Sequence, residues 1–202
     1  HLYARRQRQM CIRDRLDTKK PDEMNVTNML KQMKKDRKIN GEGFYLAPTH
    51  PEVEAHLQNV LTELLQNYRL DGVHFDYIRY HDLGWGMNPM GLKLFLNYSS
   101  GMPGLPELKI QEKPSFSDFK RLAITQFLKK ASSRIKAYQP NCIVSAAVKP
   151  NIYSARNTFG QEWDLWLTAG YIDWAVPMNY TGNNQLFDNN LQIINDNIPK
   201  KY

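Results

Sequence analysis

Three short apolar segments, separated by stretches with helical spacing, restrict the fold of this chain more than any other feature. The segments cover residues 73–78, 142–148 and 172–178 and are rich in residues that favour strands. Apolar residues recur at helical spacing over 49–68, 115–139 and 162–169, and again towards the C-terminus. Strands that are apolar on both faces and alternate with helices predict parallel βα units with helices packed on the sheet.

Residues at the ends of these segments support the same order of elements. Thr49 and Glu52 have the spacing of a capping box, and Pro51 suits a first helical turn because it has no N–H to leave unpaired. Asp173 lies at the start of the third strand and is expected to be a loop or capping residue. The segment 81–114 is rich in glycine and proline, so we expect a long loop there.

The fold class expected from this pattern is α/β. Parallel strands place their carboxyl ends at one edge of the sheet, so Asp76, Lys149 and Asn179 are predicted to converge there. A closed (β/α)8 TIM barrel contains eight strands in about 250 residues, whereas only three strands are predicted here. The chain is therefore either a partial TIM barrel, holding its central βα units, or a small open sheet.

The N-terminal residues 1–15 differ from the rest of the chain. They contain five arginines and one aspartate, and they lack the pattern of a secretory signal. A natural basic arm is one interpretation of such a run. Reverse translation of residues 5–15, however, gives codons that resemble a sequencing adapter read in frame, so we interpret residues 1–15 as an adapter-like artefact. We therefore expect the sequence to be a piece of a longer protein.

The net charge depends on this interpretation. The whole chain has 27 basic and 20 acidic residues, a net charge of +7. Removing the five arginines and the aspartate of residues 1–15 leaves 22 basic and 19 acidic residues, or +3. So weak an excess, with no zinc-finger or helix-turn-helix pattern, predicts no nucleic-acid partner. The sequence has no run of about 18 apolar residues, so no membrane span is predicted.

The segment 71–80, which reads DGVHFDYIRY, carries the clearest local sign of a functional site. Alternation along a strand places His74 and Asp76 on one face. A carboxylate at the end of an apolar strand is costly to bury unless it is paired or lies at the mouth of a site. The structural alternative is a pair with Arg79. We favour a functional Asp76 because barrel enzymes take catalytic groups from the carboxyl ends of strands.

Five segments in order resemble the bacterial glycosyl-hydrolase-like family 10. They are residues 45–53 (YLAPTHPEV), 71–80 (DGVHFDYIRY), 144–150 (VSAAVKP), 161–166 (QEWDLW) and 173–180 (DWAVPMNY). The resemblance implies a TIM barrel in which Asp76 ends the fourth strand, and it implies hydrolysis of a polysaccharide. The expected organisation is then an adapter-like segment over 1–15, a polar connection over 16–43 and a partial glycosidase-like barrel over 44–202.

Glycoside hydrolysis ordinarily uses two carboxyl groups, about 5–5.5 Å apart in retaining enzymes and about 6.5–9.5 Å apart in inverting ones. Asp76 is predicted to be the nucleophile or base, held ionised by polar neighbours such as Arg79 and Lys149. Glu162 is the candidate for the second group, with a favourable place in the first turn of a helix as its structural alternative. Weaker candidates in the long loop are Asp82 and Glu112.

Side chains expected to contact the sugar lie around Asp76. Flat aromatic rings with polar tips suit sugar recognition, which favours Tyr80 and Trp85. The whole predicted substrate-binding set is His74, Arg79, Tyr80, Trp85, Lys149, Asn179 and Tyr180. The remaining tryptophans, Trp163, Trp166 and Trp174, are expected in the packing between helices and sheet.

Two alternatives to a glycosidase stay open, a non-catalytic carbohydrate-binding barrel and a metal-dependent hydrolase or deacetylase. The second would use His74, Asp76, His81 and Asp82, but zinc sites also need a third protein ligand and supporting hydrogen bonds. We expect no metal or other cofactor. The family resemblance implies an exported bacterial protein, extracellular or periplasmic and with a lipid anchor as an option, whose partner is an oligo- or polysaccharide.

Overall fold

The computed structural model describes residues 46–81, 88–99 and 115–199. The chain divides into two compact units, formed by residues 1–56 with 84–119 and by residues 57–83 with 120–202. Helices α3 (Pro51–Asn67) and α5 (Phe116–Tyr138) contribute residues to both units. Both helices match their predicted ranges closely. The expected polar connection over 16–43 lies outside the described residues.

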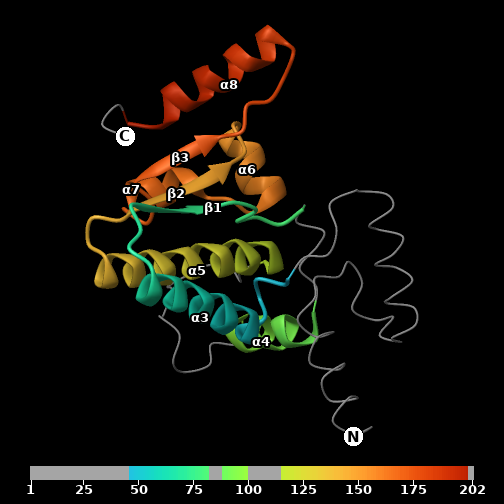
Figure 1. The fold of residues 1–202 in the computed structure, drawn as a ribbon. Helices are drawn as coiled ribbons and strands as arrows, with labels where there is room; N and C mark the ends of the chain where they lie inside the picture. Colours follow the sequence, from blue (N-terminus) through green and yellow to red (C-terminus); the bar gives the residue numbers. More distant parts are fainter. Residues whose placement is uncertain (1–45, 82–87, 100–114, 200–202) are drawn as a thin grey trace, which may run out of the picture. The chain divides into compact units, whose positions relative to one another are not determined.

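The second unit contains a sheet of three parallel strands, as the sequence predicts. The strands are β1 (Gly72–Phe75), β2 (Ile143–Val148) and β3 (Trp174–Pro177), and they lie side by side in this order (Figure 1). In the register, His74 lies opposite Ser145 and Ala146 lies opposite Ala175. β1 ends before the predicted residue 78 because Tyr77 has a φ of 51°, which no strand residue adopts.

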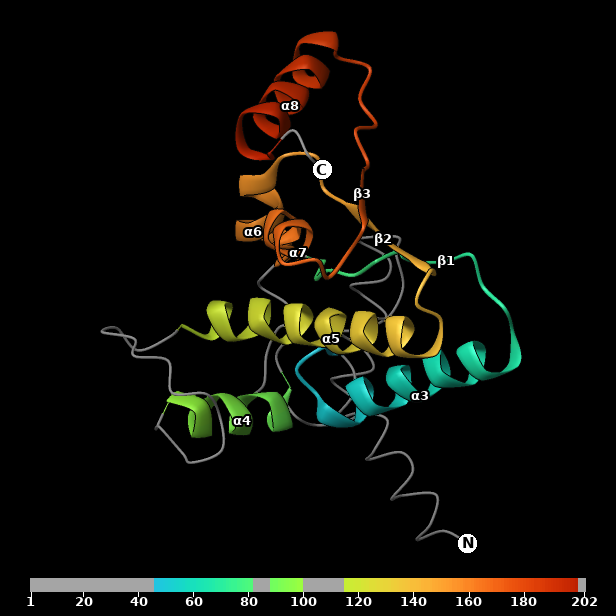
Figure 2. The ribbon, with the colours of Figure 1, turned by 90° about the vertical axis from the view of Figure 1, so that its left-hand side faces the viewer.

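Three further helices belong to this unit, α6 (Ile152–Phe159), α7 (Trp163–Thr168) and α8 (Asn184–Asn197). Figure 2 shows α6 and α7 beside each other next to the sheet. α7 and α8 match the predicted segments, whereas α6 was not predicted. Its ends nevertheless carry sequence signals, because the Asn151 side chain accepts hydrogen bonds from the amides of Tyr153 and Ser154, and Gly160 ends the helix with a φ of 72°.

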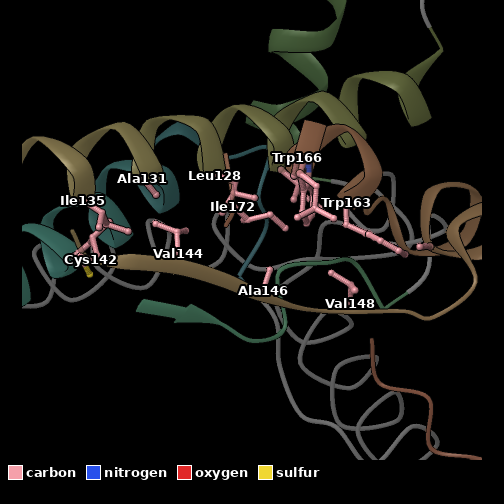
Figure 3. Packing of buried hydrophobic residues seen from close by; sticks show 14 of the residues in the cluster. Leu128, Ala131, Ile135, Cys142, Val144, Ala146, Val148, Trp163, Trp166 and Ile172 are labelled. Carbon is pink, nitrogen blue, oxygen red and sulfur yellow. The ribbon is translucent and has the colours of Figure 1, made fainter. Parts of the chain in front are cut away.

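One face of the sheet packs against α5, α6 and α7 in a single apolar core. Alternate residues of β2 point into it and face Leu128 and Ala131 of α5 (Figure 3). Trp163 and Trp166 are buried in the same core, as predicted, and the Trp166 indole N–H donates to Thr125 Oγ1 at 2.9 Å. The core contains residues of β2 and of all three helices. Its β2 members are Val144, Ala146 and Val148.

The opposite face of the sheet carries the remaining strand side chains. His74 is exposed there, and its Nδ1 lies 2.9 Å from Ser145 Oγ. Trp174 is 60% exposed and Val176 is 44% exposed. The prediction that Trp174 packs between helix and sheet is therefore wrong, because strand alternation places it on the face away from the helices.

At the amino end of the sheet, the Asp173 side chain forms hydrogen bonds with residues of β2 and α5. Its Oδ2 accepts hydrogen bonds from the Val144 amide and from Lys136 Nζ, both at 2.8 Å. Burial raises the pKa of the Asp173 carboxyl, but these hydrogen bonds and the Lys136 charge outweigh it and leave the pKa below its ordinary value of 3.8. Asp173 is thus a structural residue, as expected from its place before the strand.

The first unit contains α4 (Pro89–Ser99), within the segment predicted to be a long loop. That prediction is wrong for these residues. Asn88 caps the helix, since its Oδ1 accepts from the Gly91 amide at 2.7 Å, and Pro89 occupies the first helical position. The Asn88 side chain also donates to Thr49 Oγ1 at 2.7 Å, ahead of α3. In the same unit Phe95 packs edge-on against the rings at the start of α5, with 5.2 Å between the centroids of Phe95 and Phe116.

None of the helices in the described ranges is both long and apolar enough to cross a membrane.

Candidate active site

The carboxyl end of β1 presents a carboxylate to solvent. Asp76 follows the last strand residue, its side chain is exposed, and its Oδ1 accepts a hydrogen bond from the Tyr77 amide at 2.7 Å. The backbone turns sharply at Tyr77, where φ is 51°, and the Arg79 amide donates to the Tyr77 carbonyl at 2.8 Å. After this turn the Tyr80 amide donates to the Phe159 carbonyl at 2.9 Å, so the chain runs to the end of α6.

Two cations and two aromatic rings lie together beside this turn. The Arg79 guanidinium carbon lies 4.8 Å from the centroid of the Tyr77 ring and 5.6 Å from that of Phe159, at the end of α6. Lys149, which follows β2, places its Nζ 4.6 Å from the Phe159 centroid. Arg79 is only 9% exposed, and its Nη1 donates to the Tyr80 carbonyl at 3.2 Å. The residues that follow β1 and β2 thus meet at the Phe159 ring. Parallel pairing predicts that the two strand ends lie at one edge, whereas the contact with α6 was not predicted.

Gln161 holds these strand ends in place, and sequence analysis did not single it out. Its side chain is fully buried. Gln161 Oε1 accepts from the Lys149 amide at 2.9 Å, and Nε2 donates to the carbonyls of Ala147 at 3.0 Å and Ile78 at 3.3 Å. The Trp163 indole N–H donates to the Lys149 carbonyl at 3.0 Å. The available signal was its place as the first residue of the segment 161–166, directly ahead of residues expected in the core, because an amide that is buried there must find hydrogen-bond partners.

The end of β3 contributes two residues of the predicted substrate-binding set. Asn179 joins the strand to α8: its Nδ2 donates to the Phe187 carbonyl at 3.2 Å, and its Oδ1 accepts from Asn190 Nδ2 at 2.9 Å. These hydrogen bonds attach the end of β3 to α8, so Asn179 has a structural role. Tyr180 is 89% exposed and free of packing on most of its surface.

Three other members of the predicted set occupy different environments. Tyr80 is 1% exposed and its hydroxyl donates to the Lys120 carbonyl at 3.2 Å, so its ring is part of the core instead of a surface for sugar. His74 lies on the open sheet face beside Ser145. Trp85 lies outside the described residues.

Glu162 is surrounded by basic and hydroxyl side chains of the helices. Its Oε1 lies 3.8 Å from Arg121 Nε and 3.7 Å from Arg156 Nε, and its Oε2 accepts from Thr125 Oγ1 at 3.2 Å. It stands directly before α7, yet makes no side-chain capping hydrogen bond there. The carboxylate therefore links α5 and α6 to the start of α7.

Within the described ranges, no three or more histidine, cysteine, aspartate or glutamate side chains gather in a group able to hold a metal ion. Of the four residues considered for a metal site, Asp82 lies outside these ranges. The other three, His74, Asp76 and His81, lie within these ranges and are not part of any such group.

The model of the family described as glycosyl hydrolase-like 10 matches residues 10–201. This chain belongs to that family. The match includes all five segments that carry the resemblance, and with them Asp76 and Glu162.

The fold has a counterpart among solved structures. A structure described as the PgaB (BpsB) glycoside hydrolase domain from Bordetella bronchiseptica is similar to this glycosyl hydrolase-like 10 chain with a TM-score of 0.58 and 15% sequence identity. The similarity covers 75% of this chain and 46% of the PgaB chain, so this chain spans less than half of its length. Among curated proteins, no match was found.

The arrangement has the chemical components of one half of a glycosidase site. An exposed carboxylate can act as nucleophile or base, and the nearby Arg79 and Lys149 side chains supply positive charge and hydrogen-bond donors.

Proposed function

We propose that this glycosyl hydrolase-like 10 chain forms part of a glycoside hydrolase that cleaves glycosidic bonds in a polysaccharide. The observation that carries the proposal is the exposed Asp76 carboxylate at the carboxyl end of a parallel sheet, the position from which barrel enzymes take their catalytic groups. Bacterial cell-wall glycan is the substrate class that we propose first, and an extracellular or periplasmic location follows from a substrate of that kind.

The fold in which this activity would operate is a TIM barrel. The three parallel strands, with α5, α6 and α7 packed on one face, would supply the central βα units of such a barrel. Its remaining strands would cover the face that carries His74, Trp174 and Val176. The PgaB domain, of which this chain covers 46%, is long enough to hold the additional units.

Asp76 is proposed to act as the nucleophile or the general base. Its exposure leaves the carboxylate accessible to a sugar or to an attacking water, and the bond from the Tyr77 amide orients it. Glu162 is the weaker half of the predicted pair, because its oxygens already face Arg121, Arg156 and Thr125. We propose a structural role for Glu162, and name Asp82 and Glu112, outside the described residues, as the next carboxyl groups to mutate.

The test compares single substitutions in the protein expressed from its complete gene. Asp76→Asn is expected to lower kcat on a panel of bacterial and plant glycans by about 10²- to 10⁴-fold, since it removes a catalytic carboxylate without changing its size. Glu162→Gln is expected to lower the melting temperature and to leave most of kcat. Asp188→Asn, an exposed substitution on α8, serves as the matched control.

The outcomes separate the candidate functions. Cleavage by Asp76→Asn at the wild-type rate would show the catalytic assignment to be wrong. Glycan binding by the wild type without any cleavage would favour a non-catalytic carbohydrate-binding barrel. A loss of kcat in Glu162→Gln as large as that in Asp76→Asn, at unchanged melting temperature, would restore Glu162 as the second catalytic carboxyl group.

A further inference from the structure

An open hollow of about 550 Å³ lies at the amino end of the sheet, at the opposite end of β1 from Asp76. It forms where the turn between α3 and β1 meets the turn between α5 and β2, and all the described residues that line it belong to the second unit. Pockets that hold small molecules have volumes of about 300–1,000 Å³. Among the described residues that line the hollow, none belongs to the candidate active site. The polar side chains that line it include Gln66, Tyr68, Arg69, Asp71, Tyr138 and Asn141.

The Gln139 side chain joins the two turns that form the hollow. Its Nε2 donates to the carbonyls of Leu65 at 3.0 Å and Tyr68 at 2.8 Å, and its Oε1 accepts from the Leu70 amide at 2.8 Å. The Gln139 carbonyl accepts from the Cys142 amide at 3.0 Å within the second turn. These bonds fix the backbone on both sides of the hollow, so its shape is formed before any ligand binds, as is usual for binding sites.

Two tyrosines bring aromatic surface to the hollow, one from the end of each helix. Tyr68 follows α3 and is 61% exposed, and Tyr138 ends α5 and is 47% exposed. The Tyr138 hydroxyl accepts from Gln66 Nε2 at 3.2 Å, which connects the ends of the two helices. Within the described residues, neither ring lies against another aromatic ring or a cation. Packing in this part of the chain therefore leaves both rings available to a ligand.

The polar side chains of the hollow suit a neutral ligand that is rich in hydroxyl groups. Arg69 and Asp71 carry opposite charges, and the other described side chains that line the hollow are uncharged. Their charges cancel, which argues against a phosphate or a polyanion, since such ligands favour clustered cations. The exposed amides of Gln66 and Asn141 contain both donors and acceptors, as hydroxyl groups do. A sugar combines such hydroxyls with CH-rich faces that pack on aromatic rings.

We infer that this hollow is a second carbohydrate-binding site, which holds a neutral segment of the polysaccharide while another segment is cleaved at Asp76. The inference rests on the proposed function and deepens it. Asp71 and Asp76 directly precede and follow β1, so they are about 17 Å apart at the rise of a β-strand. A polysaccharide that binds at both ends gains affinity because its second contact is intramolecular. A short oligosaccharide bound at Asp76 gains nothing from the hollow.

The experiment compares cleavage of the polysaccharide with cleavage of the shortest oligosaccharide that the wild type accepts, in the protein expressed from its complete gene. The double substitution Tyr68→Ala with Tyr138→Ala is expected to raise KM for the polysaccharide about tenfold and to leave kcat unchanged. For the oligosaccharide, both constants should stay within about twofold of the wild type. Replacing both tyrosines with phenylalanine keeps the rings and should keep most of the affinity. Tyr153→Ala is the matched control, because Tyr153 is 57% exposed and its hydroxyl donates to Asn197 Oδ1 of α8 at 3.2 Å.

The two substrates separate a second site from other effects of the substitutions. An unchanged KM for the polysaccharide in the double alanine variant, with Asp76→Asn inactive, would overturn the second site and leave the proposed function intact. An equal rise of KM for both substrates, or a loss of kcat on both, would show that the tyrosines act through the fold or the active site, which also overturns the inference. A wild type that cleaves no glycan would overturn the proposed function and, with it, the second site.

Discussion

Replacing Gln161 with methionine would remove the polar link between the ends of β1 and β2 with little change of shape. The side chain is fully buried and makes three hydrogen bonds, to the Lys149 amide and to the carbonyls of Ala147 and Ile78. Methionine has a similar length but lacks the amide oxygen and the amide N–H of glutamine, so the Lys149 N–H would lose its acceptor and the Ala147 carbonyl would lose its donor.

The size of the effect follows from these contacts. Each buried polar group left without a partner costs about 1–3 kcal/mol. The bonds to Lys149 and Ala147 are 2.9 and 3.0 Å long, whereas that to Ile78 is 3.3 Å and contributes least. We therefore expect Gln161→Met to lower the free energy of unfolding by about 3–5 kcal/mol, which corresponds to a melting temperature about 10 °C lower.

The assay is urea denaturation followed by circular dichroism, together with hydrogen exchange of the Lys149 amide. Gln192→Met, an exposed substitution on α8, is the matched control and is expected to change stability by less than about 0.5 kcal/mol. Faster exchange at Lys149 would locate the loss at the strand ends. Unfolding of Gln161→Met and Gln192→Met at the same urea concentration, with the Lys149 amide equally protected, would show that Gln161 does not stabilise the strand ends.

Two further predictions concern the helix cap and the amino end of the sheet. Gly91→Ala should destabilise the protein by about 1–3 kcal/mol, because the added Cβ would lie 2.8 Å from Asn88 Nδ2 and 2.9 Å from Thr49 Cβ. The control is Gly182→Ala, whose Cβ would meet no atom within 4 Å and which should leave the melting temperature unchanged. Asp173 has a lowered pKa in the folded state, so its stabilising contribution is present above its ordinary pKa of 3.8 and is lost as the pH falls through the lower folded pKa. Urea midpoints measured from about pH 6 down to about pH 2 should therefore fall less steeply in Asp173→Asn than in the wild type; equal slopes would contradict the assignment.

The sequence predicted the elements whose signals are local and periodic. The three strands and helices α3, α5, α7 and α8 follow from apolar spacing, which burial on one face of a helix or sheet requires. α4 and α6 were missed because glycine and proline lie at or near their termini, and these residues also mark loops. The capping residues Asn88 and Asn151 were the sequence signals for the starts of these two helices, but asparagine is also common at the start of a turn.

The candidate site was predictable in its location and less so in its members. Parallel strands place their ends at one edge, so Asp76 and Lys149 could be named from the sequence. Whether Tyr77 or Tyr80 faces outward depends on the turn that follows β1, and the φ of 51° at Tyr77 is not encoded by a glycine. The partners of Glu162 come from α5 and α6, which both precede it in the chain, and only the packing of these helices brings Arg121 and Arg156 to its carboxylate.

The sequence by itself determined the order of strands and helices, the parallel sheet and the edge at which a site can form, because these depend on repeating apolar patterns within short segments. Only the tertiary structure decided what each polar side chain at that edge does. It buried Tyr80, exposed Tyr77 against Arg79, paired Glu162 with arginines and placed Gln161 between two strand ends. Such contacts join segments far apart in the chain, and their geometry follows from how the whole core packs.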